Sequence, residues 1–174
     1  MLESLAHAQA RSAPSLAEVV GYGSTSDAHN MLAPLPSGRG IANAITDALV
    51  DAKLNADAVD YINAHGTGTE LNDQVETLGV KLALGDAAHS TPISSIKGAT
   101  GHAMGGSSAI EAVSCVQVLG AGVIPPTINY NEPDPDCDLD YVPNTAREVA
   151  LDVVASTSLG FGGHNACVVF RAFR

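Results

Sequence analysis

Residues 59–69 read VDYINAHGTGT, an apolar run that stops at a histidine and opens into a turn of glycines and threonines. The run is short and rich in apolar and aromatic residues, which predicts a buried strand over residues 59–64. A helix follows, with Asn72 or Asp73 placed to cap its first N–H groups and Gly85 placed to end it. Its apolar stripe consists of Leu71, Val75, Leu78 and Leu82. A strand, a glycine-rich turn and a helix in this order indicate an α/β fold.

The same alternation of strand and helix patterns continues on both sides of this stretch. Further strands are predicted at residues 17–22, 92–95, 151–157 and 165–170, and further helices at residues 41–52 and 105–119. This order predicts a mixed, mostly parallel five-stranded sheet with an antiparallel edge and helices on both faces. Ligands of such sheets bind at the C-terminal ends of the strands. Those ends carry His65, the loop of residues 97–102, and Phe161.

The helix predicted at residues 105–119 has almost no polar face. A helix that is apolar all round must be covered on every side, so it predicts a layer of protein that these residues do not encode. Its one carboxylate, Glu111, would be costly to bury without a partner. Lys97 is the expected partner, with a bound monovalent cation as one alternative and a solvent-exposed glutamate as the other.

Composition limits the classes of function. The chain has 174 residues and a formal net charge of −11, which disfavours nucleic-acid binding. The N-terminus lacks a secretory signal and no apolar run is long enough for a membrane span, so we expect a cytoplasmic protein. The three cysteines are too few and too scattered for a disulfide framework or a zinc site, and no metal or cofactor is expected.

Two histidines, His65 and His102, are the candidates for chemistry. Each alone is more often a structural histidine, and the turn after His65 could also cradle a phosphate, although no P-loop lysine follows. Both, however, follow predicted strands and lie in loops of small residues, with Lys97 nearby. Two neutral imidazoles aimed at one point can donate Nε2–H hydrogen bonds to an oxyanion or an enolate. None of the cysteines has the setting of an activated nucleophile, so an attacking group is missing.

Three separated motifs together resemble those of the β-ketoacyl-[acyl-carrier-protein] synthases of type II fatty acid synthesis and the condensing modules of polyketide synthases. They are DYINAHGTGT at residues 60–69 with Asn72-Asp73, SSIK to TGH at residues 94–102, and GFGGHN at residues 160–165. The stretches at residues 125–129 and 137–144 fit as well, so the resemblance covers nearly the whole chain in order. It implies a thiolase-like fold of two pseudo-symmetric halves. Residues 1–30 would be the tail of the N-terminal half, and residues 31–174 the C-terminal half.

The resemblance implies an activity, decarboxylative Claisen condensation of an acyl thioester with malonyl-acyl-carrier-protein to give 3-oxoacyl-acyl-carrier-protein in fatty acid elongation. By position, His65 and His102 would stabilise the enolate and assist decarboxylation. Lys97 would orient and electrostatically tune the two imidazoles, with Asn63 and Glu111 in supporting positions.

Substrate contacts and partners are implied in the same way. Thr67 and Thr69 would bind the pantetheine arm, and Phe161 would gate the nucleophile with its backbone N–H in the oxyanion hole. The expected partners are malonyl- and acyl-loaded acyl carrier protein, an N-terminal half carrying the nucleophilic cysteine, and a second copy in a homodimer. The isolated chain would then be inactive. The sequence departs from the family pattern at Thr157 and Leu159, where the synthases usually have Asn and Phe.

Two other functions fit parts of the pattern. A non-catalytic partner subunit resembling the chain-length factors of ketosynthases is the first, although it would have no need of His65, Lys97 and His102 together. A stand-alone histidine-dependent decarboxylase or esterase is the second, and it lacks a nucleophile and a complete pocket.

Overall fold

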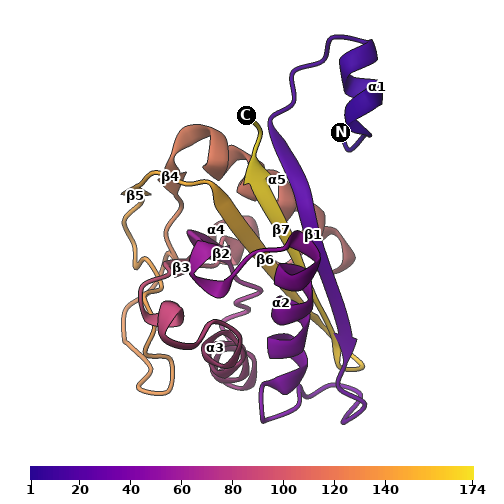
Figure 1. Ribbon diagram of the computed structural model, residues 1–174. Coiled ribbons are helices and arrows are strands. Elements are labelled where there is room, and N and C mark those ends of the chain that lie inside the picture. Colours follow the sequence, from indigo (N-terminus) through magenta and orange to yellow (C-terminus); the bar gives the residue numbers. More distant parts are fainter.

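The computed structural model describes all residues, 1–174, and its centre is a five-stranded sheet in the order β1-β7-β6-β2-β3 (Figure 1). The strands are β1 (Ala17–Ser26), β2 (Tyr61–Asn63), β3 (Ile93–Ser94), β6 (Val153–Gly160) and β7 (His164–Ala172). The helices are α1 (Leu5–Ala10), α2 (Arg39–Ala52), α3 (Glu70–Leu84), α4 (Lys97–Thr100) and α5 (Ser107–Ala121). A second sheet pairs β4 (Val123–Ile124) with β5 (Arg147–Glu148), and short 3₁₀ helices span Ala56–Ala58, Gly85–His89 and Met104–Gly106.

The predicted mixed α/β sheet is confirmed, with a larger antiparallel share than expected. Strand β2 pairs in parallel with β3 and β6, whereas β7 pairs antiparallel with β6 and β1. The antiparallel part arises because β6 and β7 form a hairpin around residues 161–163, to which β1 adds as the edge strand. Residues 17–26 thus belong to the same sheet as the rest, and the boundary at residue 30 stays a prediction.

The two faces of the sheet are covered by different helices (Figure 1). Alternate residues of β2 divide between them, because successive side chains of a strand point to opposite faces. Ile62 packs with α2 and α3, whereas Tyr61 packs with Cys115 and Val118 of α5. Helix α2 lies directly on β1, where a Cβ at Gly23 would come 2.1 Å from the carbonyl oxygen of Ala44. That close approach requires glycine.

Helix α3 differs from the prediction at its start and in its buried face. It begins at Glu70 with Thr69 as N-cap, so Asn72 and Asp73 lie inside its first turn rather than capping it. Of the predicted stripe only Val75 is buried, and the leucines are exposed (Leu71, Leu78 and Leu82). The helix instead turns Glu76 inward, because the backbone N–H groups of the turn after β2 need a buried acceptor.

Helix α5 starts two residues later than predicted, after a 3₁₀ turn. Glu111, Cys115 and Val118 face the sheet, whereas Ile110 and Val113 are exposed on the outer side. An open apolar face is what an all-round apolar helix shows when nothing covers it. The covering layer stays a prediction. None of the helices combines the length and hydropathy that crossing a membrane requires.

Candidate active site

The fold brings the two candidate histidines into contact. His65 is the second residue after β2, and His102 lies in the loop between α4 and α5. Their ring centroids are 5.4 Å apart and the rings meet edge to face at 82°. His65 is 7% exposed, whereas His102 is open to solvent. Two motifs that are far apart in the sequence therefore form one site, as their positions after neighbouring strands predicted.

A buried ion pair lies beneath these rings. The Nζ of Lys97, at the start of α4, pairs with Glu111 Oε1 of α5, and the two side chains are only 6% and 2% exposed. The same Nζ donates to the backbone carbonyl of His65 and lies 3.4 Å from its Nδ1. The expected pairing of Glu111 with Lys97 is confirmed, and the alternative of a solvent-exposed glutamate is wrong.

The ion pair also determines which nitrogen of His65 carries the proton. An ammonium group donates hydrogen bonds and cannot accept them. The Nδ1 that faces Lys97 must then present its lone pair. The proton of the neutral ring sits on Nε2, the atom available to a ligand.

Burial, helped by the positive charge of Lys97 and by His102, lowers the pKa of His65 from 6.5 to about 3. Desolvation is the largest of these causes, because it disfavours the charged form of the ring. His65 is therefore a neutral imidazole near pH 7. It can donate an N–H hydrogen bond without carrying a charge.

This lowered pKa predicts a loss of stability in acid. Between pH 6.5 and about pH 3 the unfolded chain binds a proton at residue 65 that the folded chain does not. The free energy of unfolding then falls by up to about 1.4 kcal/mol for each unit of acidification. In the His65→Gln variant this contribution is absent, so its unfolding free energy, measured in urea at about pH 7 and about pH 5, should fall less. The exposed His29→Gln variant should behave like the parent chain; equal pH dependence in all three would contradict the assignment.

Glu76 is a site residue that the sequence analysis missed. It is buried on α3 and accepts hydrogen bonds from the backbone N–H of His65 and of Gly66, each at 2.8 Å. Thr157 of β6 donates to the same carboxylate at 2.6 Å and accepts from the His65 N–H at 3.2 Å. Desolvation raises the pKa of Glu76. Glu76 and Thr157 together hold the backbone that carries His65. Thr157, one of the two departures from the family pattern, therefore has a structural role here.

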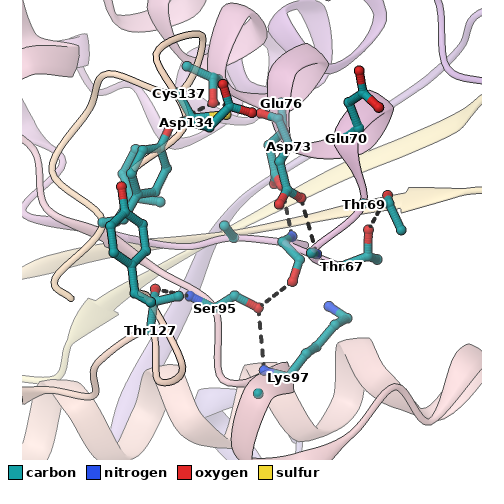
Figure 2. Close-up of a pocket in the computed structure, with 18 of the residues that line it drawn as sticks. Thr67, Thr69, Glu70, Asp73, Glu76, Ser95, Lys97, Thr127, Asp134 and Cys137 are labelled. Carbon is teal, nitrogen blue, oxygen red and sulfur yellow. Dashed lines mark hydrogen bonds between the residues drawn. The ribbon is translucent and has the colours of Figure 1, made fainter. Parts of the chain in front are cut away.

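A cavity of about 460 Å³ opens beside the site (Figure 2). One side is formed by Thr67 and Thr69, whose hydroxyl oxygens are 2.9 Å apart, and Lys97 and His102 also line it. The far side carries Cys137 and the stacked rings of Tyr130 and Tyr141. The predicted pantetheine-binding threonines thus lie on the same cavity as Lys97 and His102, whereas His65 lies behind its wall, between the lining residues Ala64 and Gly66.

Two other predicted site residues lie apart from the cavity. Phe161 is exposed in the turn between β6 and β7 and does not line the cavity. Asn63 is fully buried on β2, and neither its Oδ1 nor its Nδ2 has a hydrogen-bond partner. The gating role of Phe161 and the supporting role of Asn63 stay predictions.

None of the cysteines is an activated nucleophile. Cys115 and Cys167 are buried, and burial raises the pKa of each thiol to about 12. Burial also raises the pKa of Cys137, which lies among acidic residues. A thiol, unlike a thiolate, is a poor nucleophile.

Comparison with known proteins identifies the family. Residues 16–131 match the family described as beta-ketoacyl synthase, C-terminal domain. The chain is 49% identical to the 3-oxoacyl-[acyl-carrier-protein] synthase 2 of Synechocystis sp. (strain ATCC 27184 / PCC 6803 / Kazusa) over 174 residues, which is 100% of this chain and 42% of that protein. The chain thus spans less than half the length of this relative.

Two solved structures share the fold. One is a type II PKS acyl-carrier protein in complex with its ketosynthase bound to the hexaketide, with a TM-score of 0.96 at 40% identity over 99% of this chain and 42% of that one. The other is the ishigamide ketosynthase/chain length factor, with a TM-score of 0.94 at 42% identity over 99% of this chain and 42% of that one. The thiolase-like fold that the motifs imply is confirmed, and the chain belongs to the family of β-ketoacyl synthase C-terminal domains.

Proposed function

We propose that this chain supplies the His/His/Lys part of the active site of a 3-oxoacyl-[acyl-carrier-protein] synthase. The reaction is the decarboxylative condensation of an acyl thioester with malonyl-acyl-carrier-protein, as in fatty acid elongation. The observation that carries the proposal is the contact of His65 with His102 above the buried Lys97–Glu111 pair. The cavity lined by Thr67 and Thr69 lies beside them and would take the pantetheine arm.

The geometry suits the chemistry of an enolate. In the decarboxylation step, the bond between the α-carbon and the carboxylate of malonyl breaks, carbon dioxide leaves, and the electron pair moves into the thioester enolate. The N–H groups of His65 and His102 would donate to the enolate oxygen, where charge develops. Its α-carbon then attacks the carbonyl of the acyl thioester, a carbon–carbon bond forms, and the thiolate leaves. A neutral His65 can make this donation near pH 7.

The rest of the enzyme would come from outside these 174 residues. The acyl group would sit on a cysteine of an N-terminal half, since the three thiols here have raised pKa values. The open face of α5, with Ile110 and Val113, is where that half would pack. Phe161, exposed in the turn between β6 and β7, would gate that nucleophile.

Acyl carrier protein is the proposed partner, because a solved relative is a ketosynthase in complex with such a protein. With a net charge of −11 in this chain, basic contacts to an acidic carrier would come mostly from the other half. The complete enzyme would work as a homodimer in the cytoplasm.

Acyl transfer tests the proposal. The purified chain, incubated with radiolabelled acyl-acyl-carrier-protein, should stay unlabelled, because its thiols are not activated. Addition of an N-terminal ketosynthase half should place the label on that half and, with malonyl-acyl-carrier-protein, yield the 3-oxoacyl product. Covalent label on Cys115, Cys137 or Cys167 would show that the nucleophile has been assigned wrongly.

A non-catalytic partner subunit is the second candidate, favoured by the likeness to a ketosynthase/chain length factor structure. The two candidates differ in what the histidines do. If this chain is such a partner, His65→Ala and His102→Ala will leave the condensation rate of the assembled enzyme unchanged.

A further inference from the structure

His102 makes one side-chain hydrogen bond, in addition to its edge-to-face contact with His65. Its ring is exposed, so packing does not hold it in the way that it holds the buried His65. The Oγ of Ser107 lies 2.9 Å from His102 Nδ1. Ser107 is the first residue of α5 and is 5% exposed, and its hydroxyl has no other hydrogen-bond partner in the structure.

We propose that Ser107 is a positioning residue that donates its hydroxyl proton to Nδ1 of His102 and so holds this ring as the Nε2–H tautomer. The proposal rests on the proposed function, for which it supplies the second N–H donor. It makes the two histidines alike: Lys97 sets the tautomer of His65, and Ser107 sets that of His102.

The direction of this hydrogen bond follows from the position of Ser107 on the helix. A serine hydroxyl can donate or accept, so distance alone does not decide between them. Backbone N–H groups point out of the N-terminus of α5, and its N-cap, Gly106, makes no side-chain hydrogen bond to them. The partial positive charge there favours a hydroxyl whose oxygen points towards the helix and whose hydrogen points away from it. The acceptor in that outward direction is His102 Nδ1.

The tautomer matters because of what each one offers a ligand. With Nδ1 occupied as an acceptor, the proton of neutral His102 is on Nε2, and Nε2 becomes a donor. The opposite tautomer would present a lone pair at Nε2 and would repel a developing oxyanion. A hydroxyl that orients His102 thus acts through that ring and need not touch the substrate.

The first test reads the tautomer directly, without any activity. The chain is labelled with ¹⁵N at histidine and studied by NMR in alkaline buffer, where free imidazole is neutral. His102 of the parent chain should show a single Nε2–H tautomer, and Ser107→Ala should shift it to a mixture. Ser108→Ala is the matched control, because the Ser108 hydroxyl instead pairs with that of Ser158 at 3.0 Å. The His65 resonances should be unchanged in both variants, which reports that the fold is intact.

The second test uses the chain assembled with its nucleophilic half. Ser107→Ala should lower kcat for malonyl decarboxylation by about fivefold, as expected for loss of one hydrogen bond, with little change in KM. Ser107→Thr keeps the hydroxyl, so this variant should have the kcat of the parent enzyme and the Nε2–H tautomer of His102.

The two tests separate this proposal from the proposed function. A parent chain whose His102 carries its proton on Nδ1, or a Ser107→Ala chain with an unchanged tautomer, would overturn the part given to Ser107. An unchanged kcat alongside a shifted tautomer would overturn it too. A correct tautomer in an assembled parent enzyme that forms no 3-oxoacyl product would instead overturn the proposed function alone.

Discussion

Glu111→Ala should lower the free energy of unfolding by about 3–5 kcal/mol, the range for removal of one partner of a buried ion pair. The reason is that the ammonium group of Lys97 would stay buried without its counter-charge. Equilibrium unfolding in urea measures this loss, provided that the m-value shows that both chains unfold in one step.

Two further variants make this result specific. Asp138→Ala also breaks an ion pair, with Lys81, but both of those side chains are partly exposed, so the free energy of unfolding should hardly change. The double variant Lys97→Met/Glu111→Leu removes both charges and should recover much of the lost stability, since no charge is left unpaired. If Glu111→Ala and Asp138→Ala lost the same free energy of unfolding, burial of the Lys97–Glu111 pair would not be the cause of the effect.

His65→Ala should lower the rate of malonyl decarboxylation by about 100- to 1000-fold in the chain assembled with its nucleophilic half. This is the range for removal of one donor to a developing oxyanion. The fold should persist, because the hydrogen bonds to Glu76 and Thr157 come from the backbone N–H of residue 65. Release of labelled carbon dioxide from malonyl-acyl-carrier-protein measures the effect.

Separate assays of acyl transfer and of malonyl decarboxylation distinguish a catalytic role of His65 from a structural one. Transfer of the acyl group to the cysteine of the other half should survive in His65→Ala, since that step does not form the malonyl enolate. His29→Ala, which replaces an exposed histidine, should keep full decarboxylation. His65→Ala/His102→Ala should lose less than the product of the single losses, because the two donors act on one oxygen. If both single variants kept full decarboxylation, the catalytic role proposed for His65 and His102 would be wrong.

Elements whose burial follows a regular period were predicted best from the sequence. The helix expected at residues 41–52 is α2 (Arg39–Ala52), because its apolar positions repeat on one face that packs on the sheet. The strand expected at residues 59–64 is β2, shortened to Tyr61–Asn63. The His65–His102 contact was also within reach, because both motifs follow parallel strands, whose ends meet at one edge of the sheet.

The buried face of α3 was predicted wrongly because a local pattern competes there with a distant requirement. The leucines of α3 form a regular stripe, yet they face outward because Glu76 has to reach the N–H groups behind His65. No periodicity reports that need, since it arises only when β2, β6 and α3 are in place. The signal available in the sequence was Glu76 itself, a carboxylate directly after Val75 of the apolar stripe.

By itself the sequence determined the α/β class, the order of most elements, and the motif residues His65, Lys97 and His102. These depend on short-range patterns, which act within one helix turn or one strand. Only the tertiary structure decided which face of α3 is buried, that Glu76 and Thr157 meet behind His65, and that Glu111 is buried against Lys97. Such contacts join segments that the sheet and its covering helices bring together, so their distances are set by packing rather than by spacing along the chain.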